Sequence, residues 1–119
     1  MQQINSIRPF IGAKDYELSR EFYRAWGFEE IEISNRMSYF HLGHFGFYLQ
    51  DYFVKEWVDN SMVFLEVDNL ETYWEELKAK NLDTQFQNVK LVDPQKYSWG
   101  SEGFVHDPSN ILWHIGCFF

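Results

Sequence analysis

The sequence predicts an α+β fold in which two βαβββ modules form a cup-shaped mixed sheet. Strand-like and helix-like segments follow one another in the same order in both halves of the chain. The halves also overlay when Phe10 is aligned with Phe64, and Gly27 then meets Asn81. Gly and Asn are the residues that best accept the left-handed conformation in which helices end, so the overlay indicates an internal duplication.

The first module begins with a predicted strand at Ile7–Ala13, in which Pro9 removes a backbone donor and so favours a sheet edge. A predicted helix follows, with Asp15 as its N-cap and Gly27 at its end. Apolar residues spaced four apart give this helix one buried face, formed by Leu18, Phe22 and Trp26.

Three further strands complete the first module. Residues 29–34 alternate, which places Ile31 and Ile33 on one face of a strand. Residues 37–42 and 45–50 are typical of a hairpin, since Gly43 and the following His44 separate two strand-like runs.

The second module repeats this order. A strand is predicted at 62–67, followed by a helix over 68–81 that Asp68 or Asn69 caps. The chain then continues as a β-prone stretch over 84–92, a loop over 93–99 and a final hairpin. The apolar face of the helix consists of Leu70, Tyr73, Trp74 and Leu77.

Length and composition indicate one compact domain, with modules at about 4–58 and 61–119. The aromatic share of 20% is high enough both for a substantial core and for a ring-lined pocket. A net charge of −8 argues against nucleic acid and anionic membranes as partners, and it permits a cationic ligand. Its simpler interpretation is that acidic charge keeps an aromatic-rich protein in solution. We expect a cytoplasmic location for three reasons: the chain has a single cysteine, Cys117, it lacks a signal-peptide pattern, and it lacks an apolar run of membrane-spanning length.

Three segments in order carry a resemblance to a known family. The first is KDYELSREFYRAWGF at 14–28, the second is MVFLEVDNLETYWEEL at 62–77, and the third is WGSEGFVHDPSNILWHIG at 99–116. Together they resemble the vicinal oxygen chelate superfamily, which includes glyoxalase I, bleomycin-resistance proteins and extradiol dioxygenases. The resemblance covers nearly the whole chain and implies a glyoxalase/bleomycin-resistance fold. Members of this size dimerise, so it also implies a homodimer with cups at or near the interface.

The resemblance further implies three positions at which metal-using members hold a divalent ion. In this chain these positions carry Arg8, Met62 and His114. Arg is not a metal ligand and Met suits copper(I), so His114 is the only one of the three that binds common divalent ions. We therefore expect no metal cofactor, and we expect these residues to line a ligand cavity instead. The predicted ligand-binding set is Arg8, Phe10, Met62, Phe64, Glu66, Trp99 and His114.

Several assignments within this set remain open at the level of sequence. Arg8 and His114 are a polar pair suited to a carboxylate or phosphate, or else Glu66 neutralises Arg8. His114 is either a cavity residue or a core histidine with one hydrogen bond. The other histidines, His41, His44 and His106, are expected in surface or structural roles.

Other aromatic residues divide between core and surface. Trp26, Trp74 and Trp113 are expected in the core, the last pointing opposite to His114. Trp57, between the modules, is expected to cover the cup or a dimer interface. Cys117 is expected to be buried or interfacial.

The leading functional hypothesis is a metal-free small-molecule-binding protein that resembles bleomycin-resistance proteins and sequesters an aromatic or cationic ligand. The alternative is a metal-dependent lyase, isomerase or dioxygenase with an atypical site that includes His114. A third hypothesis is a regulatory or structural dimer with a vestigial cup. The cup would be filled by large side chains in that case.

Overall fold

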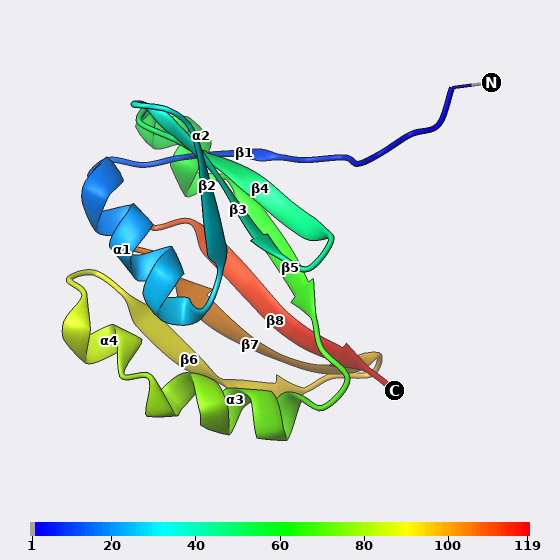
Figure 1. Cartoon of the computed structure of the whole chain (residues 1–119). Helices are drawn as coiled ribbons and strands as arrows, with labels where there is room; N and C mark the ends of the chain where they lie inside the picture. Colours follow the sequence, from blue (N-terminus) through cyan, green and yellow to red (C-terminus); the bar gives the residue numbers. More distant parts are fainter. Residues whose placement is uncertain (1) are drawn as a thin grey trace.

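A computed structural model describes residues 2–119 and confirms the α+β class with two modules (Figure 1). The first module holds a four-stranded sheet in the order β1-β4-β3-β2, with β1 parallel to β4 and the remaining pairs antiparallel. Its elements are β1 (Phe10–Gly12), α1 (Tyr16–Trp26), β2 (Glu29–Ser34), β3 (Met37–Leu42), β4 (Phe45–Gln50) and the short α2 (Lys55–Asp59).

The second module repeats this topology in a separate four-stranded sheet of order β5-β8-β7-β6. Asn69 caps its helix by accepting from the Thr72 amide. Its elements are β5 (Met62–Glu66), α3 (Leu70–Ala79), α4 (Leu82–Gln85), β6 (Lys90–Lys96), β7 (Gly100–His106) and β8 (Leu112–Phe118).

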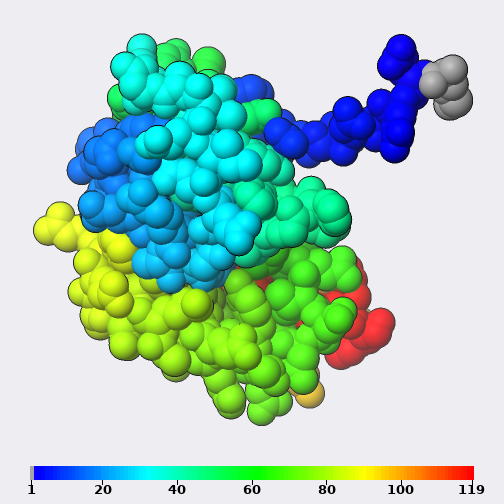
Figure 2. Space-filling model, viewed as in Figure 1, coloured from blue at the N-terminus to red at the C-terminus, as the bar shows by residue number. Residues whose placement is uncertain are grey.

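The first strand is shorter than predicted. It begins at Phe10 rather than Ile7, because Pro9 has no amide to donate and only its carbonyl oxygen pairs, with the Tyr48 amide. Residues 2–9 form an extended arm that projects from the body (Figures 1 and 2). Ile4 and Ile7 in this arm are 84% and 92% exposed.

The stretch after α3 also differs from the prediction. The β-prone run over 84–92 begins instead within α4, because Asn81 adopts a left-handed conformation and its carbonyl accepts from the Thr84 and Gln85 amides. The loop predicted over 93–99 belongs largely to β6. A register shift between Val92 and Gln95 lets this strand stay paired with β7 past Pro94.

The overlay of the two halves is confirmed at its main positions. Gly27 and Asn81 both have positive φ, 121° and 55°. Tyr23 on α1 and Leu77 on α3 are both fully buried. The predicted core residues Trp26, Trp74 and Trp113 are also buried.

The core lies between the modules, with α1 at its centre. Tyr23 contacts Trp113 of the second sheet and Phe47 of the first, with ring centroids 5.9 and 4.9 Å away. Trp113 also contacts Phe47 directly at 5.5 Å. The helix-covered sides of both sheets therefore share one core. Their helix-free sides turn away from it, so that within one chain these two faces do not meet.

A buried hydrogen-bond network joins the modules inside this core. Tyr23 donates its hydroxyl to Asp107 at 2.7 Å and accepts from the Trp113 indole at 2.9 Å. The other Asp107 oxygen accepts from the Ser109 and Ile111 amides. Asp107 thereby fixes both the turn between β7 and β8 and the position of α1.

No helix within residues 2–119 has the length and apolar character needed to cross a membrane.

Burial of Asp107 makes a prediction for pH dependence. Removal from water raises the pKa of this carboxyl from about 3.8 to about 6, against the opposing effect of its hydrogen bonds. The folded state then binds a proton more tightly than the unfolded state. Stability associated with Asp107 should be greatest below pH 4 and should fall by about 3 kcal/mol as the pH rises to about 6.

The measurement is urea unfolding of the wild type and Asp107→Asn between pH 4 and 7.5. The variant cannot titrate at this position, so the difference between the two free energies of unfolding isolates Asp107 from other acids. A difference that stays constant across this range would show that the carboxylate is ionised throughout.

Candidate functional site

The helix-free side of the first sheet, called the first face here, carries a row of apolar and aromatic side chains. The strand registers align Phe10, Tyr48, Tyr39 and Ile31 across all four strands. Phe10 stacks on Tyr48 at 5.0 Å. Phe10 and Ile31 are 58% and 51% exposed.

Arg8 lies over this row. Its guanidinium carbon is 4.0 Å from the centre of the Tyr39 ring. Its Nη1 donates a hydrogen bond to the Tyr48 hydroxyl at 2.9 Å. Within the described residues no carboxylate forms an ion pair with Arg8. The first face therefore presents an uncompensated cation on an aromatic surface. His41 and Glu29 also lie on this face, with the His41 Nε2 3.6 Å from a Glu29 carboxylate oxygen.

The second face, the helix-free side of the second sheet, has an equivalent row. Here the registers align Phe64, His114, Phe104 and Val92. His114 takes the place that Tyr48 occupies in the first module. Trp113 points the opposite way, into the core, as predicted.

His114 is held by a partner that the sequence reasoning missed. Its Nδ1 lies 2.5 Å from a carboxylate oxygen of Glu102, and both side chains are largely buried, at 23% and 12% exposure. Its Nε2 lies 3.3 Å from the Met62 sulfur. The signal was present in the sequence, because alternation along β7 places Glu102 on the same side as Phe104. The alternative that Glu66 neutralises Arg8 is not found within one chain, since no ion pair joins the two among residues 2–119.

An aromatic cluster adjoins His114 at one end of the second face. Phe64 lies 6.3 Å from Trp99 and 5.7 Å from Phe118, and Trp99 and Phe118 are 5.2 Å apart. Tyr97 stacks on Trp99 with nearly parallel rings. All four rings are 36–54% exposed, so the cluster offers an open aromatic surface.

The predicted site residues therefore divide between the two faces. Arg8 and Phe10 lie on the first face, whereas the second carries Met62, Phe64, Glu66, Trp99 and His114. Glu66 is exposed and has no basic partner among the described residues, and the cation on that face is Lys90 at its β6 edge. One chain does not bring Arg8 to His114.

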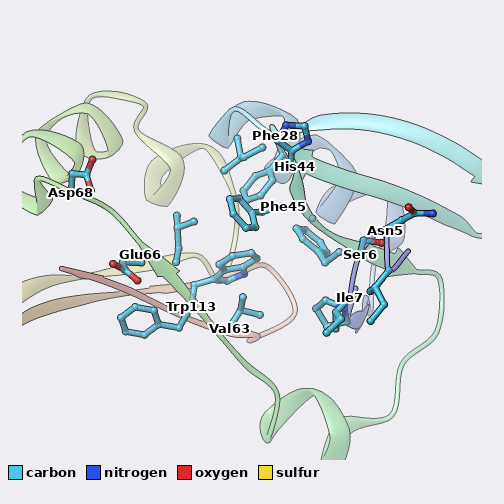
Figure 3. Close-up of a pocket in the computed structure, with 17 residues that line it drawn as sticks. Asn5, Ser6, Ile7, Phe28, His44, Phe45, Val63, Glu66, Asp68 and Trp113 are labelled. Carbon is cyan, nitrogen blue, oxygen red and sulfur yellow. The ribbon is translucent and has the colours of Figure 1, made fainter. Parts of the chain in front are cut away.

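A separate groove of about 880 Å³ opens between β5, the β3–β4 turn and the arm (Figure 3). Its floor is the edge of the core, where Phe28, Phe47 and Trp113 lie. Phe45 lines it and is 82% exposed. Of the predicted site residues only Phe64 and Glu66 reach it.

The donor set at the positions that the resemblance assigns to a metal does not fit a divalent ion. Arg8 carries a fixed positive charge and is engaged with two tyrosines. Met62 offers a soft thioether, and Glu102 is directed at Nδ1 of His114 rather than at a shared centre. Within residues 2–119 no three His, Cys, Asp or Glu side chains gather closely enough to hold a metal.

Gly116 gives the Phe64 ring room to lie across the second face. A Cβ at this position would lie 2.5 Å from the ring. Because Phe64 is half exposed, we expect Gly116→Ala to fold with a loss below about 1 kcal/mol while moving this ring away from Trp99. Near-ultraviolet circular dichroism and tryptophan fluorescence report the change.

Gly43→Asn is the matched control, since Gly43 has a left-handed φ that Asn accepts and no neighbour within 4 Å of an added Cβ. Unchanged spectra for Gly116→Ala would contradict this packing.

Comparison with known proteins finds solved structures of similar fold. No protein-family model matches the chain, and no curated protein matches it. A bleomycin-binding protein from Streptomyces verticillus, solved with copper(II)-bleomycin, superposes over 100% of both chains with a TM-score of 0.80 and 18% identity. The antibiotic-binding protein TnmS3 from a Streptomyces species also covers 100% of both chains, at 0.75 and 16%. A lactoylglutathione lyase from Agrobacterium tumefaciens matches at 0.68 and 14%, covering 97% of this chain and 95% of its own. The chain thus has the glyoxalase/bleomycin-resistance fold.

Proposed function

We propose that the protein binds a flat small molecule without a metal, between the first face of one chain and the second face of a partner chain. The observation that carries this proposal is the chemistry of the two faces. Each presents an aromatic row, and each holds an uncompensated charge, Arg8 on the first and Glu66 on the second. An aromatic ligand can stack on such rows, and the charged side chains can bind polar groups at its ends.

A homodimer completes the site because the shared core turns the two faces of one chain away from each other. Both faces expose enough apolar surface to favour burial against a partner chain. The exposed residues are Phe10 and Ile31 on the first face, and Met62 and Phe64 on the second. In a two-fold dimer the first face of each chain meets the second face of its partner. Arg8 of one chain and Glu66 of the other then line one site, where each can face a ligand group of opposite charge.

Structural neighbours support the class of ligand. Two of the proteins that share this fold are described as binding bleomycin and an antibiotic. The net charge of −8 and the exposed Glu66 favour a ligand that carries positive charge. A sequestering protein needs affinity alone, so Arg8 and Met62 at the metal positions are compatible with this role.

The proposal predicts saturable binding of planar aromatic cations in the presence of a chelator. Titration calorimetry with a panel of such compounds, bleomycin included, should find at least one with a Kd near or below about 1 μM. Phe64→Ala should weaken that binding about tenfold or more, because it removes a stacking ring from the second face.

Phe45→Ala is the control, because it removes an exposed ring that lines the groove and not the second face. Loss of binding in Phe45→Ala alone would place the ligand in the groove and contradict the proposed site. Elemental analysis after incubation with zinc, nickel, manganese and iron(II) tests the metal-free part. Near-stoichiometric retention of one ion would overturn it in favour of the metal-dependent enzyme.

A further inference from the structure

We propose that Glu102 and His114 form a dyad whose free Nε2 is the polar anchor of the ligand site. In this role Nε2 accepts a hydrogen bond from a hydroxyl or N–H group of a ligand that lies against Phe64. The inference rests on the proposed function and adds a specific recognition chemistry to it.

The geometry assigns the two ring nitrogens different roles. A carboxylate only accepts, so the 2.5 Å contact with Glu102 places the hydrogen on Nδ1 of His114. In the neutral ring Nε2 is then an acceptor. Among the described residues its hydrogen-bond contact is the Met62 sulfur at 3.3 Å, and because a thioether can only accept, the Nε2 lone pair of this tautomer has no donor. Because Met62 is 64% exposed, its side chain is free to give way to a ligand.

The surroundings hold this ring in place and define what approaches it. Phe104 packs edge-on against His114 at 5.1 Å, and Phe64 lies nearly parallel to it at 6.4 Å. Glu66 extends from the same side of β5 and favours a positive group. The ligand class is therefore a planar aromatic molecule with a hydrogen-bond donor on its edge.

The first test needs no ligand. Nitrogen-15 NMR at about pH 8, above the range in which histidines ordinarily titrate, should show the His114 ring protonated on Nδ1 and bare on Nε2. His114→Ala identifies the signals among the four histidines. Glu102→Ala should abolish the single tautomer, whereas Glu71→Ala, an exposed first-turn residue of α3, should leave it unchanged. A His114 ring protonated on Nε2, or on both nitrogens, would overturn the dyad.

The second test uses a matched probe pair, 2-naphthol and 2-methoxynaphthalene, which differ in the hydroxyl donor. The wild type and Glu71→Ala should bind 2-naphthol about five- to tenfold more tightly, the range expected for one hydrogen bond. His114→Ala and Glu102→Ala should lose this preference while still binding both compounds. Equal binding of both by the wild type would contradict the anchor and leave the aromatic site standing. Binding of neither would contradict the proposed site itself.

Discussion

The Tyr23–Asp107–Trp113 network is the interaction on which the architecture depends. It ties α1 of the first module to the β7–β8 turn of the second, in a core where Tyr23 and Asp107 have no exposed surface. Breaking one member would leave a buried polar group without its partner, so the arrangement is held firmly. Because both sheets direct their helix-covered sides at this core, their other sides must serve a different purpose.

Those outward sides carry the residues that we propose bind a ligand. Domains in water seldom leave several large apolar side chains exposed on one face without a partner or ligand. The first face exposes Phe10 and Ile31, and the second exposes Met62 and Phe64. The Arg8 guanidinium stacked on Tyr39 and the Glu102–His114 pair place polar groups within these rows at defined positions. A few fixed polar groups among aromatic walls is the usual composition of a small-molecule site. The positions that the resemblance assigns to a metal, Arg8, Met62 and His114, do not offer a donor set that suits a divalent ion.

Much of the fold could be predicted from the sequence, because periodicity and caps act locally. The Asp15 and Asn69 caps and the left-handed Gly27 and Asn81 are such local signals. The part of β6 beyond Val92 could not be predicted, since Asp93 and Pro94 oppose a strand unless a partner strand accommodates a bulge. The division of the site residues between two outward faces could not be predicted from the sequence either, because it depends on how the two modules pack against each other. Glu102 was within reach, since the predicted hairpin already placed it on the side of His114.

The central claim is that one ligand site takes a face from each of two chains, and mixing two defective variants tests it most directly. One variant, Arg8→Ala with Phe10→Ala, disables the first face, and the other, Phe64→Ala with His114→Ala, disables the second. Each alone should bind the best compound of the cation panel poorly. After joint refolding, heterodimers contain one intact site each, so about a quarter of all sites should regain wild-type affinity. Mass spectrometry would show whether the heterodimers form. If they form and binding is not regained, the shared site is contradicted.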